Sequence, residues 1–247
     1  GPMTRNMADL ALMFSIMKGI DGHKIETDMM NGRGLFDIQM NIFKGLKFGI
    51  IDPNERSRCT DDILKSYDVT LNLLVDLGAK LEVFTSPIAY DDMAQFNGAI
   101  TMYEGYRNHR HLYDDPSKTM DQNVKKRMLA GRDITPQKHA DHLSKRQDHQ
   151  LIFKNAMADF DALITPTIIE PAPKLDEIDE DFTPGHFTRP FNYIDMSALA
   201  LPIAYSSNGL PTSLQIVVPA GQEDYVIQMG TALESALALN KQPNLSP

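Results

Sequence analysis

Cysteine, basic charge and long apolar runs are all scarce in this sequence. The single cysteine, Cys59, cannot form an internal disulfide, which fits a reducing compartment. Lysines and arginines number 24 against 33 acids, a formal net charge of −9. A broad nucleic-acid-binding face needs a basic surface, and a membrane span needs roughly 18 consecutive apolar residues. We therefore expect a cytoplasmic protein without a signal peptide that binds neither nucleic acid nor membrane.

Several common catalytic motifs are also absent. Gly32-Arg33-Gly34 lacks the spacing of a phosphate-binding loop, and no serine lies in a Gly-x-Ser-x-Gly setting. His139 and His142 are three residues apart and His149 lies further on, whereas a zinc-binding helix of the protease type places its histidines four apart. We interpret these histidines as a solvated helix face and expect no metal and no cofactor.

Cys59 is the one candidate nucleophile with a suggestive setting. It lies between Arg58 and Thr60, directly before an expected helix. A helix N-terminus and a nearby arginine both lower the pKa of a thiol. No residue beside it in the sequence would act as its base, so the chain offers no identifiable catalytic residue.

A strand, a helix and a second strand follow one another in the first third of the chain. Residues 46–51 are apolar and end at Asp52-Pro53, which predicts a buried strand. The helix begins at Asp61 and has an apolar face made of Ile63, Tyr67, Leu71, Leu74 and Leu77. Residues 80–84 form the next strand. This order is typical of a parallel crossover unit.

The remaining elements alternate in the same way. Hydrophobic spacing and turn residues predict helices over 7–17, 89–133 (interrupted), 135–160 and 223–239, and strands over 162–164, 199–204 and 212–218. Residues 206–209 between the last two strands form a turn, which indicates a hairpin. We predict a single α/β domain over 1–247, with a mixed central β-sheet flanked by helices, a loop over 170–185 and a flexible tail over 240–247.

Several blocks, in order, resemble the amidase-signature family. The most specific is 160–167, Phe-Asp-Ala-Leu-Ile-Thr-Pro-Thr, which follows Arg146 as in that family. The other matching blocks are 1–9 (Gly-Pro-Met-x-Arg-x-x-x-Asp), 20–22, 48–50, 77–79, 187–192 and 208–215, followed by Glu223 and Glu234. The resemblance covers essentially the whole chain and implies the amidase-signature fold.

The resemblance also implies a chemistry that this chain does not carry by itself. Family members hydrolyse carboxamides with a Ser, cis-Ser, Lys triad, which precedes the Gly-Pro-Met block. We therefore expect the chain to be a carboxy-terminal part of an amide hydrolase, inactive alone, that supplies pocket and scaffold elements. The alternative is a non-catalytic binding or scaffold protein of the same fold.

The substrate-binding residues implied by the resemblance lie in the second half of the chain. Arg127 matches an arginine that holds a substrate carboxylate in the tRNA-linked amidotransferase A subunits; a solvated helix face is the alternative. His186 stands where those subunits have an acid that pairs a substrate ammonium, and Asp195 stands where the family has glycine. The predicted set is Tyr103, Tyr106, Arg127, Thr167, His186, Asn192 and Asp195. The tyrosines have core packing as their alternative.

The resemblance finally implies an exposed surface. In the family the preceding region adds strands to the same sheet, so this chain alone would leave an unpaired sheet edge. We expect it to bind an amino-terminal amidase region, or itself, near the first helix with its Met7, Leu10, Phe14 and Met17. The alternative is a compact monomer. The expected ligand of the complete enzyme is a small-molecule amide.

Overall fold

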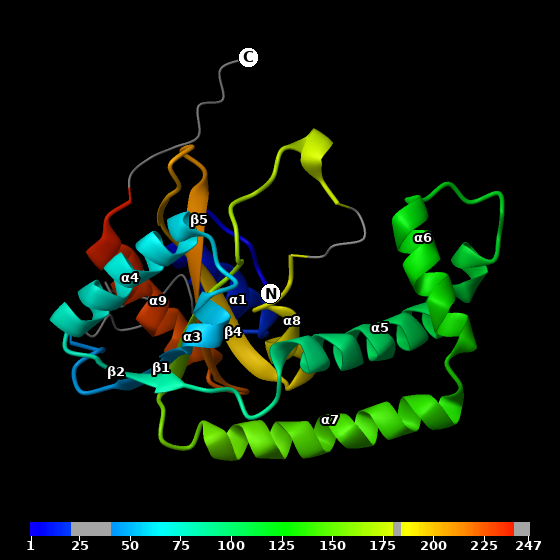
Figure 1. Cartoon of the computed structure of the whole chain (residues 1–247), viewed down its shortest axis with the longest axis horizontal. Helices are drawn as coiled ribbons and strands as arrows, with labels where there is room; N and C mark the ends of the chain where they lie inside the picture. Colours follow the sequence, from blue (N-terminus) through cyan, green and yellow to red (C-terminus); the bar gives the residue numbers. More distant parts are fainter. Residues whose placement is uncertain (21–40, 180–183, 240–247) are drawn as a thin grey trace. The chain divides into compact units, whose positions relative to one another are not determined.

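A computed structural model of the chain describes residues 1–20, 41–179 and 184–239 (Figure 1). The chain divides into two compact units. The first consists of the described residues within Gly1–Phe84, Phe160–Pro171 and Ser197–Pro247, and the second of those within Thr85–Asp159 and Ala172–Met196. The single-domain organisation over 1–247 stays a prediction.

The first unit is built on a mixed five-stranded sheet with the order β2-β1-β3-β5-β4. Its strands are β1 (Lys47–Ile51), β2 (Lys80–Phe84), β3 (Ala162–Pro166), β4 (Met196–Tyr205) and β5 (Pro211–Pro219). β1 runs parallel to β2 and to β3, whereas β3 and β5 are antiparallel, with Thr165 opposite Gln215. The mixed sheet predicted from the sequence is confirmed.

The predicted crossover unit is confirmed as well. Helix α4 (Asp61–Asp76) connects the parallel strands β1 and β2, and its buried residues include Ile63, Tyr67, Leu71 and Leu74. A short helix that the sequence did not predict, α3 (Pro53–Arg56), precedes it. It forms because Asp52 accepts hydrogen bonds from the amides of Asn54 and Glu55, and Pro53 fits the first helical turn.

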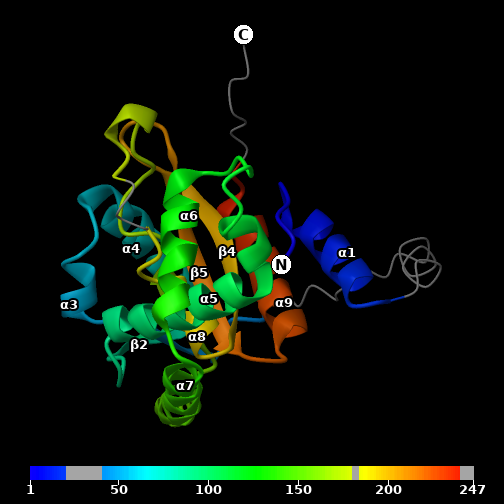
Figure 2. The same cartoon turned by 90° about the vertical axis from the view of Figure 1, so that its right-hand side faces the viewer.

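Helices cover both faces of this sheet (Figure 2). On one face α4 is anchored by the Tyr67 hydroxyl, which donates to the carbonyl of Ile164 at 2.6 Å. On the other face lies α9 (Glu223–Leu237), with α1 (Met7–Met17) packed against it. Gly230 makes this approach possible, because a Cβ there would lie 2.2 Å from Cδ2 of Leu199 and 2.9 Å from Cε of Met7. Glu234 accepts from the Met7 amide at 3.0 and 3.1 Å.

Of the apolar side chains that we expected at an exposed surface of α1, Met7 is buried and Met17 is exposed, so this prediction holds only in part. The helix begins after Asn6, whose side chain accepts from the Asp9 amide, and its buried residues are Met7, Ala11 and Ser15. Met17 is 65% exposed, because α9 covers only one side of the helix. Met13, Ile16 and Met17 therefore form an apolar stripe that faces away from the packed side.

The hairpin predicted at the end of the chain is present. β4 and β5 are neighbours in the sheet, and the short connection between them makes them antiparallel. In the turn, Gly209 has φ of +77° and its amide donates to the Ser206 carbonyl. The Ser207 amide and hydroxyl both donate to Asp62 at the start of α4, which fixes the turn to the rest of the unit.

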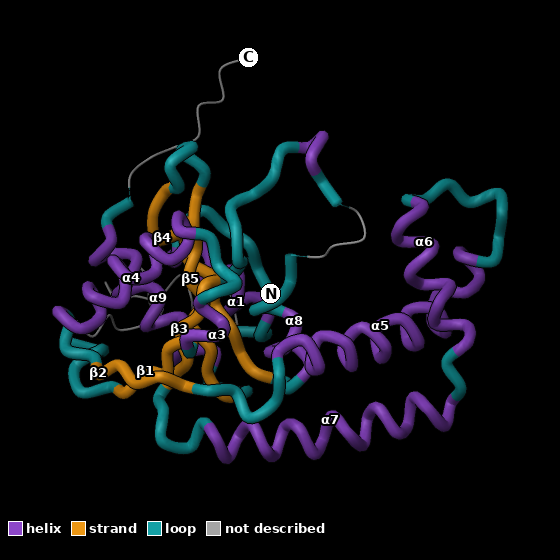
Figure 3. Tube along the Cα trace, in the orientation of Figure 1, coloured by secondary structure: helices purple, strands orange, loops and turns teal. Residues whose placement is uncertain are grey.

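The second unit is helical in its described residues. It contains α5 (Tyr90–Tyr113), α6 (Gln122–Leu129), η1 (Ala130–Asp133), α7 (Pro136–Ala156), η2 (Leu175–Glu177) and α8 (Arg189–Tyr193). α5 and α7 lie side by side and run in opposite directions (Figures 1 and 3). The interruption predicted within 89–133 is confirmed, and α7 ends four residues before the predicted Phe160.

Some predictions fall outside the described residues. These are the Asp21-Gly22 part of the block at 20–22, the glycines at 32 and 34, residues 180–183 of the loop predicted over 170–185, and the tail over 240–247. In the described part of that loop, η2 is the only regular element. Across the described ranges, no helix combines the length and apolar character that crossing a bilayer requires.

Candidate functional site

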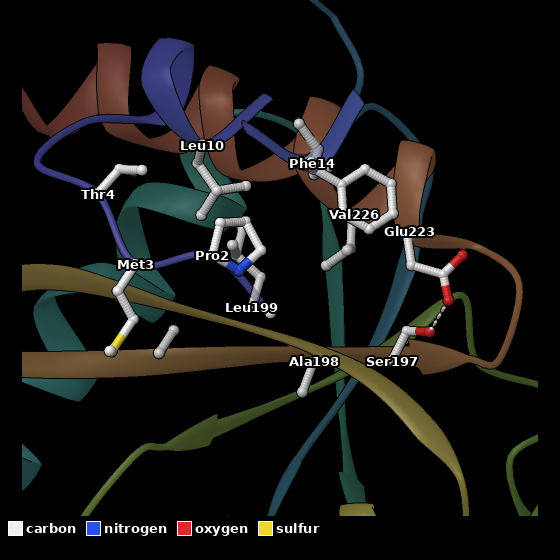
Figure 4. A pocket seen from close by; sticks show the side chains of 13 residues that line it. Pro2, Met3, Thr4, Leu10, Phe14, Ser197, Ala198, Leu199, Glu223 and Val226 are labelled. Carbon is white, nitrogen blue, oxygen red and sulfur yellow. Dashed lines mark hydrogen bonds between the residues drawn. The ribbon is translucent and has the colours of Figure 1, made fainter. Parts of the chain in front are cut away.

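A pocket of about 400 Å³ opens in the first unit (Figure 4). Its walls come from the first residues of the chain, α1, β4 and the start of α9. Its apolar lining includes Leu10 and Phe14 of α1, Val226 of α9 and Leu199 of β4. Its volume lies in the range of small-molecule sites.

The polar end of the pocket is a serine–glutamate pair. The Ser197 hydroxyl donates to Oε1 of Glu223 at 2.7 Å, and the Gly221 amide donates to the same oxygen at 3.2 Å. The hydrogen bond from Ser197 is the main reason why the pKa of Glu223 lies below its usual value. Because Ser197 is engaged with a weakly basic carboxylate, the pair fixes the pocket wall and does not supply an activated nucleophile.

The predicted tyrosines of the second unit are held by their neighbours. The Tyr103 ring stacks on His139 with centroids 4.1 Å apart. The buried Tyr106 donates its hydroxyl proton to Asp114 at 3.0 Å, and Arg132 donates to the Tyr106 hydroxyl at 3.3 Å and to Asp114 at 2.8 Å. Tyr106 thus ties α5 to the segment after α6, and its predicted substrate contact stays a prediction.

Two arginines of the second unit come within electrostatic reach of each other. Arg127 is exposed near the end of α6, where its Nε donates to the Asn123 carbonyl at 3.3 Å. Arg189, at the start of α8, is half-buried, and both its burial and the charge of Arg127 lower its pKa. Sequence reasoning missed Arg189. The signal was a basic residue at the variable position of Phe187-Thr188-Arg189-Pro190, within the matching block at 187–192.

The interpretation of the histidines as a solvated helix face is wrong. His149 is only 6% exposed, and its Nδ1 lies 3.1 Å from the Tyr193 hydroxyl. Phe96 of α5 lies edge-on to both His142 and His149. The Nδ1 atoms of His139 and His142 are buried and find no hydrogen-bond partner among the residues that the structure describes. The inner face of α7 therefore combines imidazoles with the buried ring of Phe153. No group of three or more His, Cys, Asp or Glu side chains among the described residues is arranged to hold a metal ion.

This histidine face predicts a pH-dependent stability. Burial lowers the pKa of His142 and of His149, and the positive charges of Lys138 and Lys145 lower them further. In the unfolded chain both imidazoles return to about 6.5, so below that pH the unfolded state binds more protons than the folded state. The free energy of unfolding should therefore fall as the pH drops from 7 towards 5.

Urea denaturation at pH 7 and pH 5.5 measures this difference. We expect the loss of stability between the two pH values to be smaller in His149→Gln than in the native chain. His111→Gln, at an exposed position of α5, should leave the loss unchanged. An identical loss in all three proteins would contradict the role of the buried imidazole.

The expectation of a low pKa for Cys59 is also wrong. Burial, and to a smaller extent the nearby carboxylate of Glu55, raise the pKa of this thiol to about 11. The thiol lies 3.7 Å from the Glu55 carbonyl, to which it donates. Desolvation outweighs the arginine here, so Cys59 is a thiol and a poor nucleophile at neutral pH.

Comparison with known proteins gives a consistent assignment. The family model described as Amidase matches residues 1–227. The chain belongs to the amidase-signature family. The A subunit of the glutamyl-tRNA(Gln) amidotransferase of Rhodospirillum rubrum is 26% identical to this chain over an aligned length of 275 residues, gaps included. The alignment covers 98% of this chain and 54% of that protein. The mitochondrial A subunit of the same enzyme from Aedes aegypti is 26% identical, and the alignment covers 99% of this chain and 56% of that protein.

Solved structures show the same fold. A crystal structure of an amidase has a TM-score of 0.77 at 24% identity, with 95% of this chain and 52% of the amidase covered. 6-Aminohexanoate cyclic dimer hydrolase, solved in complex with its substrate, has a TM-score of 0.65 at 20% identity. The match covers 81% of this chain and 47% of that hydrolase. The chain spans about half the length of the curated relatives that it matches.

The structure also locates the two positions at which the resemblance implied a departure from relatives. His186 has its Nδ1 3.3 Å from Oδ1 of Asp91 and lies edge-on to Tyr90. Asp195 is exposed and has φ of +63°. Glycine adopts this left-handed conformation without strain, and aspartate is one of the few other residues that tolerates it. Asp195 therefore forms the turn between α8 and β4.

The last two predicted site residues lie in different units. In the second, Asn192 is exposed, and its carbonyl accepts from Arg146 at 3.4 Å. In the first, Thr167 follows β3 and donates its amide to the Ser213 carbonyl at 3.2 Å. Its hydroxyl is buried and has no partner in the described chain. Of the predicted set, only Thr167 therefore presents an unsatisfied buried polar atom.

Proposed function

We propose that this amidase-signature chain is the carboxy-terminal part of an amide hydrolase. It supplies pocket and scaffold elements, and the Ser, cis-Ser, Lys residues of catalysis come from sequence outside these 247 residues. The observation that carries this proposal is the extent of the match: the family model covers residues 1–227, yet the chain spans about half of each relative. In the described ranges, no serine hydroxyl or cysteine thiol hydrogen-bonds to a lysine or histidine side chain, the usual means of activation.

The substrate side of the proposal rests on Arg127. Its guanidinium lies at an exposed position and its Nε donates to a backbone carbonyl, while its terminal nitrogens have no hydrogen-bond partner among the described residues. An arginine can hold a carboxylate through two parallel hydrogen bonds. We infer that the complete enzyme acts on a small amide that carries a carboxylate.

The kinetics of the complete enzyme test this role. Arg127→Ala should lower kcat/KM for a carboxylate-bearing amide by about 1.5–3 kcal/mol of transition-state stabilisation, the range for a hydrogen bond to a charged group. The same change should leave kcat/KM for an uncharged amide of similar size unaltered. Equal losses on both substrates would assign Arg127 a structural role. Unchanged kinetics on both would support the alternative interpretation, in which Arg127 is part of a solvated helix face.

A second part of the proposal concerns the edge of the sheet. β4 is the last strand in the order, and no described strand pairs with its outer edge. Its residues alternate between buried Leu199, Leu201 and Ile203 and exposed Ala198, Ala200 and Pro202. α1 adds its exposed stripe of Met13, Ile16 and Met17. We infer that an amino-terminal amidase region covers this surface and that a second copy covers it when that region is absent.

Light scattering of the isolated chain tests this inference. An unpaired ten-residue edge should template association, so we expect dimers or larger species at tens of micromolar, together with binding of a hydrophobic dye. Ala200→Lys, which places a charge on the exposed face of the edge strand, should reduce both signals. Leu175→Lys is the control, since Leu175 is 89% exposed in η2 of the other unit. A monomer that binds no dye would refute the exposed edge.

A further inference from the structure

Two residues of α7, Arg146 and His149, hold the carboxy-terminal end of α8 at Tyr193. The Arg146 guanidinium donates from Nε to the Tyr193 carbonyl and from Nη2 to the Asn192 carbonyl at 3.4 Å. The Nδ1 atom of His149 lies 3.1 Å from the Tyr193 hydroxyl. Because the two residues are three apart, they project from the same side of α7. One tyrosine of α8 is therefore bound through both its backbone and its side chain.

The hydrogen bond between Tyr193 and His149 is buried and has a defined direction. Tyr193 is 1% exposed and His149 is 6% exposed. Burial raises the pKa of Tyr193 to about 12, so the hydroxyl keeps its proton at neutral pH and donates to Nδ1. The imidazole must then be the neutral tautomer that carries its proton on Nε2. Among the described residues, Nδ1 of His149 is the only hydrogen-bond partner of this hydroxyl.

The surroundings of His149 disfavour a positive charge on its ring. Burial is the main cause that lowers the pKa of His149, followed by the charge of Lys145, while two aspartates act in the opposite direction. A proton on Nδ1 would leave the tyrosine proton without an acceptor, next to the residue that Arg146 already contacts. The charged and titratable groups around the imidazole come from α5, α7 and α8: Asp92, His142, Lys145, Arg146, Asp148 and Tyr193.

We propose that His149 and Tyr193 form a proton-controlled latch, which holds α8 on α7 while the imidazole is neutral and opens when the imidazole takes up a proton from solvent. Opening exposes the imidazole to water, where it titrates at about 6.5, so a falling pH shifts the equilibrium towards the open state. The latch differs from a global loss of stability, because α8 opens before the rest of the second unit unfolds. It does not depend on the proposed function.

Hydrogen exchange of the 247-residue chain measures the latch. The Ile194 amide donates to the Pro190 carbonyl at 3.0 Å and reports the opening of α8. Between pH 7.5 and pH 5 its protection, corrected for the intrinsic exchange rate, should fall by about tenfold, because the imidazole takes up its proton almost only in the open state. Amides around the buried Phe153 of α7 should lose less. Equal losses throughout the unit, or unchanged protection of α8, would overturn the latch.

Variants separate the two partners of the latch. His149→Gln keeps an acceptor for the tyrosine but cannot be protonated, so α8 should stay protected at both pH values. Tyr193→Phe keeps the ring and removes the hydroxyl, so protection of α8 should already be low at pH 7.5. His142→Gln is the matched control, since His142 contacts Phe96 of α5 and lies on the same helix; the fall of protection in α8 should persist. The opposite result for any of the three variants would contradict the latch.

The native chain offers a second measurement that needs no variant. The ¹⁵N signals of the His149 ring should show the tautomer protonated on Nε2 at pH 7.5. Their titration should have the same midpoint as the loss of protection in α8. The other tautomer at pH 7.5, or two clearly different midpoints, would overturn the proposal.

Discussion

The 247-residue chain alone should release ammonia from simple amides no faster than buffer does. Enzymes accelerate such reactions by at least about 10⁶-fold, and most of this comes from an activated nucleophile and preorganised oxyanion donors. The described residues offer no activated nucleophile at the two places considered: Ser197 is engaged with Glu223, and Cys59 has a raised pKa of about 11. A coupled ammonia assay with micromolar protein measures this, because it would detect a rate far below the one that such an acceleration produces.

Supplying the amino-terminal part of a family member should change this result by orders of magnitude. We expect activity when the chain is produced together with the amino-terminal half of a relative such as the amidotransferase A subunit from Rhodospirillum rubrum, and none when either part is assayed alone. Activity of the chain alone that co-purifies with it would contradict the expectation. In that case Ser197→Ala decides whether the one serine–carboxylate pair of the pocket is responsible. Complete inactivity with every partner would favour a non-catalytic scaffold protein.

The order and type of the main elements could be predicted from the sequence, because burial follows a local period in them. The face of α4 that carries Ile63, Tyr67 and Leu71 is apolar at every helical turn, and the structure buries it. The alternating pattern of β4 places Leu199, Leu201 and Ile203 inside in the same way. In these segments the local pattern and the tertiary contacts agree.

The candidate site could not be predicted to the same extent, because it depends on contacts between distant residues. The inner face of α7 carries His139, His142 and His149 beside the fully buried Phe153, while Leu151 on the same helix is 60% exposed. Polarity alone therefore misplaces part of this face. Arg189 becomes unusual only when its burial and the place of Arg127 are known. The left-handed backbone of Asp195 is likewise not indicated by the sequence, because aspartate rarely adopts a positive φ.

Gly131→Ala should destabilise the second unit by about 3 kcal/mol or more. Gly131 lies in η1, directly after α6, where the backbone touches α5. A Cβ at this position would stand 2.0 Å from the Met102 carbonyl oxygen and 3.0 Å from the Tyr103 amide nitrogen. Those atoms belong to the backbone of a regular helix and cannot rotate away, so either η1 or α5 must shift. Because α6 leads into η1, the same shift would displace Arg127.

Urea denaturation followed by circular dichroism measures the loss, and a second glycine provides the matched control. Gly98 lies within α5, and a Cβ there would meet nothing within 4 Å. Gly98→Ala should therefore raise the free energy of unfolding by about 0.4–1 kcal/mol, since alanine is the better helix former and restricts the unfolded chain. Gly105→Ala should fall between the two, because its Cβ would meet only the mobile sulfur of Met128, at 2.7 Å. If Gly131→Ala were as stable as Gly98→Ala, the close packing of η1 on α5 would be disproved, and the position of Arg127 would lose its structural support.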